Sequence, residues 1–361
     1  MRLQKIILPL ITASLSFLLM TGCANTTNNT KTEQTATKAM TNENEAEPSD
    51  SASSDSVSSY PIVIAHAFGE TILEEKPERI VTIGWGNQDT PLALGVAPVG
   101  VSAANYGLVT EHNLHPWTDE AFSSLMVEQP MVFDDVDGLD FEAISDASPD
   151  VILASYSGIT EEDYALLSEI APVVAYPDKP WQTYWRDQTI LNATGMGMKE
   201  AGEAKVAEID ALIAEKTSKY PALSGTKAAF FWISPDDFSS FYVYLPADPR
   251  AAYLNDLGLS FPDSVLAMAE NSSDFSITVS RENADQLADV EMMVVYGDEA
   301  LLEALQADEL MSQIPAIKNG AVVLVNSTSA LAGATTPSIL SIPYEIDEYL
   351  DLLSNAQGNI K

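Results

Sequence analysis

Aromatic side chains and arginines in loops between predicted elements are the residues of this chain best suited to chemistry. A tryptophan or tyrosine presents a flat apolar face, and an arginine among such rings can stack on them and donate hydrogen bonds to ligand oxygens. In an α/β fold, the loops that follow the strands are where a ligand binds. These residues are therefore candidates for a ligand-binding cleft: Trp85, Tyr106, Trp181, Arg186, Trp232, Tyr242 and Arg250.

Neighbouring aromatic residues are assigned differently. Phe230 or Phe231 and Tyr244 lie within predicted strands, and we expect them to pack in the core. Tyr156 lies just past a predicted strand, as Trp85 does, but is not one of the favoured residues. For every aromatic side chain, packing in the core is the alternative to a place in the cleft.

Motifs of catalysis are absent from the sequence. It contains no Gly-x-Ser-x-Gly nucleophile elbow, no His-Glu-x-x-His zinc motif and no P-loop. His112 and His115 have a spacing that suits a pair of metal ligands, but the residues around them indicate a loop, and His66 is the one further histidine. The sequence therefore predicts that the chain is not an enzyme and holds no cofactor or metal of its own.

The N-terminus has the layout of a secretory signal. Basic residues precede an apolar run that ends at Met20, and small residues then lead to Cys23, the only cysteine. The segment resembles a bacterial lipoprotein signal, whose cysteine is acylated and becomes the first mature residue. The resemblance implies a signal peptide at 1–22 and a lipid anchor on Cys23 at the extracytoplasmic face of a cell membrane. The alternative is an ordinary signal peptide with an incidental cysteine.

Charge and composition restrict the possible partners. The chain has 53 acidic and 17 basic residues, and its formal net charge of -36 repels nucleic acid. A single cysteine cannot form an intramolecular disulfide. The segment 23–59 is rich in Asn, Thr, Ser and Glu and cannot bury enough apolar surface to fold, so we expect a disordered spacer after the lipidated cysteine.

The rest of the chain predicts an α/β fold with two lobes. A hairpin that turns at Gly69 comes first, and apolar residues at helical spacing then predict one long helix at 199–221. Strands separated by helical stretches indicate parallel-rich sheets. We therefore expect Rossmann-like lobes at 60–198 and 222–361, joined by that helix, with the ligand cleft between them. The predicted strands are 79–84, 98–101, 151–154, 172–176, 227–233, 241–245, 290–296 and 321–325.

Each half contains a glutamate in the first turn of a short predicted helix. Glu142 follows Asp140 and precedes a buried strand, and Glu282 follows Ser280 and precedes another. The helix dipole favours such a glutamate, so one alone means little. Matching glutamates in two lobes indicate a repeated surface feature.

Several segments together carry a family resemblance. They include Lys76-Pro-Glu-Arg-Ile-Val-Thr-Ile-Gly, Leu94-Gly-Val-Ala-Pro-Val-Gly-Val, Asp140-Phe-Glu-Ala-Ile, Asp248-Pro-Arg and Thr336-Pro-Ser. In this order, behind a lipoprotein signal, they resemble the substrate-binding proteins of bacterial ABC importers for ferric siderophores, the group with a rigid helix between its lobes. The similarity runs over nearly the whole folded part.

This resemblance implies a function and partners. It implies a lipid-anchored, monomeric solute-binding protein that captures a ferric siderophore and delivers it to an ABC permease with its ATPase, so that iron enters only inside the ligand. Glu142 and Glu282 match the glutamates with which the family docks onto permease arginines. The acidic balance of the chain favours a hydroxamate chelate over a strongly anionic catecholate.

Two other ligands and one other class of protein remain open. Haem or cobalamin could replace the siderophore, because the same scaffold serves haem import. Met196 and Met198 lie near the long helix and are possible axial ligands, as are His and Tyr side chains. A lipid-anchored hydrolase on a similar scaffold is the enzyme alternative, and it would require a catalytic Ser or His.

Overall fold

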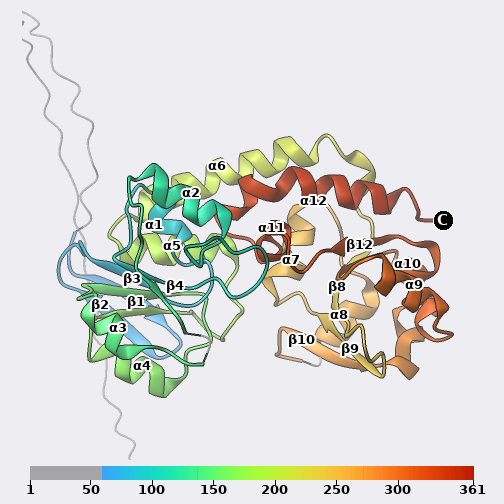
Figure 1. The fold of residues 1–361 in the computed structure, drawn as a ribbon, viewed down its shortest axis with the longest axis horizontal. Coiled ribbons are helices and arrows are strands. Elements are labelled where there is room, and N and C mark those ends of the chain that lie inside the picture. The colour runs from blue at the N-terminus through green and yellow to red at the C-terminus, as the bar shows by residue number, and fades with distance from the viewer. Residues whose placement is uncertain (1–58, 136, 271) are drawn as a thin grey trace, which may run out of the picture. The chain divides into compact units, whose positions relative to one another are not determined.

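The structure, a computed structural model, describes residues 59–135, 137–270 and 272–361. The predicted signal peptide, Cys23 and nearly all of the predicted spacer lie outside these described residues. Within them, no helix combines the length and the apolar character needed to cross a membrane. The described body has two lobes, each built on one five-stranded sheet (Figure 1).

The first lobe begins with the predicted hairpin. β1 (Ile62–His66) and β2 (Gly69–Leu73) pair antiparallel, and Gly69, with φ of +126°, begins the second strand directly after the turn. The Thr71 hydroxyl donates to the carbonyl oxygen of Val173 at 2.5 Å. This bond ties the hairpin to β7 (Val173–Ala175), an edge strand of the main sheet.

The sheet of the first lobe is parallel throughout, in the order β5-β4-β3-β6-β7. Its central strands are short and buried on both faces, which is the usual state of a parallel sheet covered by helices. Figure 1 shows α3 and α4 on one side of the sheet and α1, α2 and α5 on the other. The elements are β3 (Ile80–Thr82), α1 (Asp89–Ala93), β4 (Gly100–Ser102), α2 (Pro116–Ser124), β5 (Val132–Phe133), α3 (Phe141–Asp146), β6 (Val151–Ala154), α4 (Glu161–Ser168) and α5 (Trp185–Gly195).

The sheet of the second lobe is mixed, in the order β10-β9-β8-β11-β12. β8, β11 and β12 are parallel, whereas β9 runs antiparallel to both of its neighbours. No helix separates β8 from β9, and a short connection returns the chain in the opposite direction. The elements are β8 (Ala228–Trp232), β9 (Ser240–Tyr244), α7 (Pro249–Asp256), α8 (Asp263–Ala269), β10 (Ser276–Ser280), the 3-10 helix η2 (Arg281–Leu287), β11 (Met292–Tyr296), α9 (Glu299–Ala307), η3 (Met311–Gln313), α10 (Pro315–Asn319), β12 (Val322–Val325) and α11 (Ala330–Ala334).

The two sheets share one strand order. In each, the first strand is central, the next two lie to one side of it and the last two to the other. α3 therefore precedes the same strand of its sheet as η2 does. Asp140 and Ser280 are the N-caps of these two helices, and Glu142 and Glu282 are exposed in their first turns. The repeated sequence feature thus falls at equivalent places in the two lobes.

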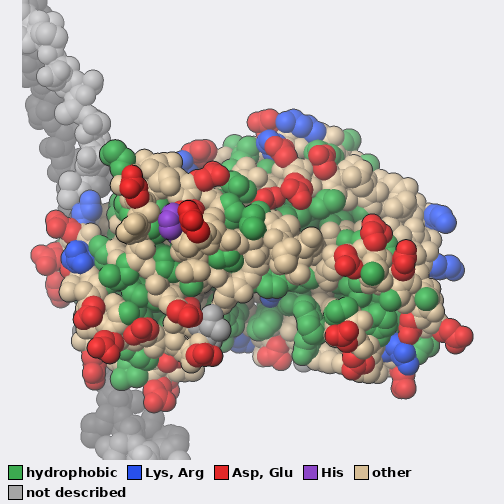
Figure 2. Space-filling view, viewed as in Figure 1, with side chains coloured by type: hydrophobic (Ala, Val, Ile, Leu, Met, Phe, Trp, Pro, Cys, Tyr) green, Lys and Arg blue, Asp and Glu red, His purple; other side chains and the backbone are tan. Residues whose placement is uncertain are grey.

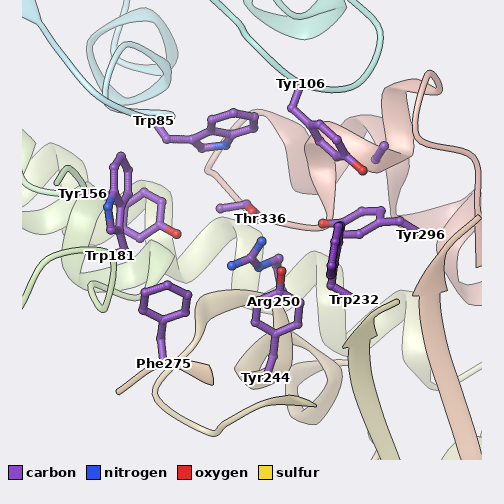
Figure 3. Close-up of a pocket in the computed structure, with 11 residues that line it drawn as sticks. Trp85, Tyr106, Tyr156, Trp181, Trp232, Tyr244, Arg250, Phe275, Tyr296 and Thr336 are labelled. Atoms are coloured by element: carbon purple, nitrogen blue, oxygen red, sulfur yellow. The ribbon is translucent and has the colours of Figure 1, made fainter. Parts of the chain in front are cut away.

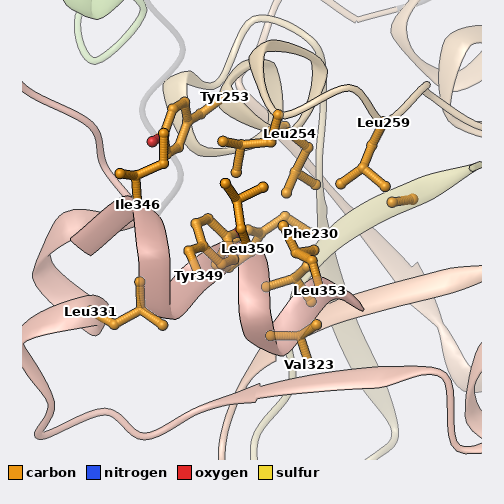
Figure 4. Close-up of a cluster of buried hydrophobic side chains, with 14 of the residues drawn as sticks. Phe230, Tyr253, Leu254, Leu259, Val323, Leu331, Ile346, Tyr349, Leu350 and Leu353 are labelled. Carbon is orange, nitrogen blue, oxygen red and sulfur yellow. The ribbon is translucent and has the colours of Figure 1, made fainter. Parts of the chain in front are cut away.

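One long helix links the lobes. α6 (Lys199–Thr217) begins where the sequence predicts but ends before 221, and the short helix η1 (Pro221–Leu223) follows it. α12 (Ser341–Gln357), which the sequence analysis did not single out, lies beside α6 (Figure 1). The two helices contribute to one hydrophobic cluster with the second sheet, and Figure 4 shows Tyr349 and Leu353 of α12 among its members. We expect this double connection to resist bending between the lobes.

Candidate ligand-binding site

A pocket of about 390 Å³ lies between the lobes, as predicted (Figure 3). Figure 2 shows the surface hollowed there, with hydrophobic side chains in the hollow and acidic side chains spread over the lobes around it. Its walls come from the loops after β3, β4, β6 and β7 of the first lobe and from strands, loops and the helices α7 and α11 of the second. The residues that line it are Trp85, Tyr106, Tyr156, Trp181, Trp232, Tyr244, Arg250, Phe275, Tyr296, Ala332 and Thr336.

The structure brings five of the seven predicted residues together at this pocket. They are Trp85, Tyr106, Trp181, Trp232 and Arg250. Tyr242 is not in the wall: it is 42% exposed and packs beside Trp232, with ring centroids 5.4 Å apart. That the lining side chains contact a ligand stays a prediction.

Arg186 lies outside the pocket. Its guanidinium forms ion pairs with Asp210 at 2.6 Å and Asp256 at 2.8 Å and stacks on Trp185. Burial opposes its charge, but the two carboxylates overcome that effect and raise the pKa of Arg186. The structure thus gives this arginine a place in the contact between α5, α6 and α7.

Sequence reasoning missed several lining residues. Tyr244, expected in the core, does pack in the core cluster and also lines the pocket. Tyr296, at the end of β11, has the same double role. Tyr156 carries the signal of the favoured candidates, since it directly follows a strand. Thr336 belongs to a segment that carried the family resemblance, whereas nothing in the sequence marks Phe275.

Among the described residues that line this pocket, Arg250 is the only charged one. Asp248, the N-cap of α7, is fully buried and binds it in a bidentate pair, with Nε to Oδ1 at 2.9 Å and Nη2 to Oδ2 at 2.6 Å. The guanidinium also lies 4.0 Å from the centre of the Tyr244 ring. Burial opposes the charge, but Asp248 raises the pKa of Arg250 well above its ordinary value. The pocket therefore holds a fixed cation, already oriented on an aromatic face.

Tyrosine hydroxyls supply further polar groups in the wall. Burial raises the pKa of Tyr244 to about 12, and it raises the pKa values of Tyr106, Tyr156 and Tyr296 as well. These phenols therefore stay protonated at neutral pH. The Tyr296 hydroxyl already donates to Thr335, whose own hydroxyl donates to the carbonyl oxygen of Ala332, so the other three phenols are the ones that can donate to a ligand. With the indole faces and Arg250, they suit a ligand that has apolar surface and outward-facing oxygen acceptors.

A buried polar network holds the loops of the first lobe. The Asn87 side chain donates to the carbonyl oxygen of Tyr156 at 2.9 Å, and Gln188 donates to that of Trp85 at 2.8 Å. The Trp85 amide also donates to the carbonyl oxygen of Tyr156 at 3.1 Å. Since Asn87 and Gln188 are buried, these bonds are shielded from water and fix the backbone of two pocket residues.

The wall formed by Trp181 depends on a glycine. Trp181 has φ of +60°, a left-handed conformation that is strained for a tryptophan. Its indole lies over Gly158, where an added Cβ would come within 2.5 Å of Nε1. The ring also meets Tyr156 edge-on, with centroids 5.3 Å apart. Close packing against Gly158 and Tyr156 holds this indole at the pocket in spite of the backbone strain.

A loop of the first lobe docks onto the second beside the pocket. Tyr106 packs edge-on against Tyr296, with centroids 5.2 Å apart. Gly107 has φ of +80°, and a Cβ there would lie 2.7 Å from the backbone nitrogen of Gly333. A side chain at Gly107 would push the loop away from the second lobe, so this glycine lets Tyr106 reach the pocket.

Asp89, the first residue of α1, links this helix to α2 and to the segment after α11. Its buried carboxylate accepts hydrogen bonds from Trp117 Nε1 at 2.9 Å, from Thr118 Oγ1 at 2.8 Å and from the Ser338 hydroxyl. Ser338 lies two residues beyond Thr336, in the segment that returns the chain to the first lobe. Asp89 therefore helps to place the Thr336 edge of the pocket.

We expect stability to depend on pH through Asp89. Burial raises the pKa of Asp89 to about 6 and its hydrogen bonds oppose the rise. Because this pKa exceeds the ordinary value of 3.8, the stabilisation from this group is full below pH 3.8 and is lost as the pH rises through 6. Between pH 4 and 7, the free energy of unfolding of the unaltered chain should fall by about 1–3 kcal/mol relative to that of the Asp89→Asn variant. Denaturant unfolding at each pH measures this difference. A difference that is independent of pH would contradict the assignment.

The histidines and methionines considered for metal or haem do not line the pocket, whereas four tyrosines do. His66 bonds to Thr71 and His112 to Asp119, while His115 is buried against Trp117 and burial lowers its pKa to about 4. Among the described residues, no three His, Cys, Asp or Glu side chains are grouped to hold a metal ion. Met196 is 1% exposed in the core of the first lobe, and Met198 packs against the same cluster.

Comparisons with known proteins agree with this architecture. The family profile described as periplasmic binding protein matches residues 80–328. The Fe(3+) dicitrate-binding periplasmic protein FecB of Escherichia coli is 25% identical over 285 residues, covering 74% of this chain and 86% of FecB. The ferric-anguibactin-binding protein FatB of Vibrio anguillarum is 24% identical over 301 residues, covering 80% of this chain and 87% of FatB. The crystal structure of Streptococcus pneumoniae TIGR4 PiaA in complex with ferrichrome matches with 48% identity and a TM-score of 0.80, over 83% of this chain and 100% of that one.

Proposed function

Because the chain belongs to the periplasmic binding protein family, we propose that its pocket captures one ferric siderophore, of the hydroxamate type, for import. The resemblance found in the sequence is confirmed, and the chain is a solute-binding protein rather than an enzyme. The observation that carries the proposal is the pocket itself, where Arg250 and several protonated phenols stand among indole faces. Such a lining fits a chelate whose own oxygens already hold the iron.

The chemistry of the pocket supports a hydroxamate. A ferric trihydroxamate is neutral at its metal centre and presents carbonyl-type oxygens, which one arginine and neutral phenols can bind. A ferric tris-catecholate carries several negative charges and would meet a single cation that Asp248 already pairs. The PiaA relative, whose structure holds the hydroxamate siderophore ferrichrome, supports the same choice.

We also propose how the protein is placed and how it delivers its ligand. Acylation of Cys23 anchors it at the extracytoplasmic face of a membrane, as the layout of the N-terminal sequence indicates. The monomer then docks onto the arginines of an ABC permease, whose ATPase drives transport, through Glu142 and Glu282. Support comes from the equivalent, exposed positions of these two glutamates.

Fluorescence titration tests the proposed ligand. Trp85, Trp181 and Trp232 line the pocket, so an iron chelate bound there should quench their emission. We expect saturable, one-to-one quenching by a ferric trihydroxamate, with much weaker responses to a ferric tris-catecholate, haem and cobalamin. Saturation by haem or cobalamin alone would overturn the proposal in favour of that ligand.

A further inference from the structure

A second cavity of about 290 Å³ adjoins the ligand pocket on the side of the first lobe. Trp85 and Trp181 line both cavities, so the two spaces share these indoles as walls. The other walls of this side compartment come from the end of β4, from loops after β3, β4, β5 and β6, and from the first turn of α4. Its volume is several times the roughly 30 Å³ of a water molecule, which leaves room for a short arm of a ligand.

The side compartment and the main pocket have opposite charge. In the part of the chain that the structure describes, the charged residues in the wall of the side compartment are two carboxylates, Asp135 and Asp163, and no Lys, Arg or His lines it. Arg250 is the charged residue of the main pocket. A ligand with oxygen acceptors at one end and a cation at the other would therefore be oriented by the two spaces together.

A hydrogen bond holds the Asp135 carboxylate in place but does not use all of its acceptor capacity. Ser102 donates from its hydroxyl to Asp135 Oδ2 at 2.5 Å, and the Gly84 amide donates to the Ser102 oxygen at 3.0 Å. An ionised carboxylate can accept about four hydrogen bonds, so Asp135 has capacity left for a ligand donor. Burial raises the pKa of Asp135 despite the Ser102 bond, and a bound cation would relieve that cost of desolvation.

Asp163 has a different local role. Its carboxylate closes the capping box of α4 with Thr160, accepting from the Thr160 amide at 2.9 Å. It still adds negative charge to the same wall. Asp135, which caps no helix, is therefore the carboxylate that can be changed with little effect on local structure.

We propose that the side compartment receives a primary ammonium group carried on an arm of the bound ferric chelate, with Asp135 as its acceptor. The inference rests on the proposed function, because the arm belongs to a ligand seated in the main pocket. An ammonium supplies three donors and a compact positive charge, and its methylene stem can pass along the Trp85 and Trp181 indoles. The repulsion between this ammonium and Arg250 favours the same orientation.

The test uses three ferric trihydroxamate chelates that differ only at the end of one arm. One ends in a free ammonium, one in the neutral N-acetyl group and one in a carboxylate added by succinylation. In titrations of the unaltered chain, we expect the ammonium form to bind about three to ten times more tightly than the acetyl form, and the succinyl form to bind most weakly. Equal affinity for all three would overturn the inference.

Two variants separate a specific contact from the general negative charge. In Asp135→Asn, which keeps an acceptor for Ser102, the preference for the ammonium form should fall to within about two-fold, and the affinity for the acetyl form should not change. In Asp137→Asn, an exposed residue of the same loop outside this wall, the preference should persist. Persistence of the preference in Asp135→Asn would refute the assignment. If no chelate binds the unaltered chain, the proposed function fails and the inference falls with it, whereas equal binding of all three refutes the inference alone.

Discussion

Reversing Glu142 and Glu282 together to lysine is expected to abolish uptake of the ferric chelate by cells, while the purified variant binds the chelate with unchanged affinity. Both side chains are exposed in first turns of helices and neither lines the pocket. A carboxylate paired with an arginine fixes orientation as well as contact, and a lysine facing that arginine repels it. The measurement is uptake of radioactive iron as the chelate, in cells that express only the variant.

A matched control distinguishes docking from net charge. Glu161 and Glu299 are also exposed glutamates in the first turns of helices, α4 and α9, and these helices precede the last strands of the two sheets. The variant Glu161→Lys/Glu299→Lys changes the net charge equally and should transport normally. Each single reversal at Glu142 or Glu282 should give intermediate uptake, since one contact remains. Normal uptake by the double variant at Glu142 and Glu282 would refute the docking assignment.

Sequence patterns suffice where a local signal determines the structure. The buried strands β6 and β11 each appear as continuous apolar runs, and α6 shows helical spacing of apolar residues. Trp85 and Trp232 were assigned to the cleft because they follow or end such a strand, where the chain leaves the sheet at its ligand-binding edge. The prediction of an α/β fold with two parallel-rich sheets is confirmed, and the structure has a pocket between the two lobes.

The remaining features depend on contacts between distant residues. Tyr244 and Tyr296 are the last residues of their strands and pack in the core, so the sequence cannot tell a ring that only fills the core from one that also reaches the cleft. Arg186 has the same surroundings in the sequence as a cleft arginine, but its partner Asp256 lies 70 residues away. No sequence signal marks Phe275, which lines the pocket because the folded chain brings it there. Likewise, β9 runs antiparallel to β8 because the connection between these two strands contains no helix.

Replacing Arg250 with methionine is expected to reduce both ligand affinity and stability strongly. The change removes the cation of the main pocket, and the loss of its charge-assisted hydrogen bonds should weaken chelate binding about 10- to 100-fold. It also leaves the Asp248 carboxylate, which is fully buried, without its ion-pair partner. Breaking a buried pair in this way costs about 3–5 kcal/mol of unfolding free energy. Chemical denaturation and fluorescence titration of the same sample measure the two losses.

A second substitution separates these two effects. In Arg250→Met/Asp248→Asn no buried charge remains, and the asparagine oxygen can still cap α7 by accepting from the backbone amide of residue 250, as Asp248 does at 2.8 Å. Most of the lost stability should therefore return, whereas the affinity should not. Arg186→Met is the matched control, because this arginine also pairs with aspartates and stacks on an aromatic ring, but outside the pocket. It should lower stability and leave affinity unchanged. Recovery of binding in the double variant would mean that Arg250 only neutralises Asp248, and the chelate would then have to be held by the phenols and indoles alone.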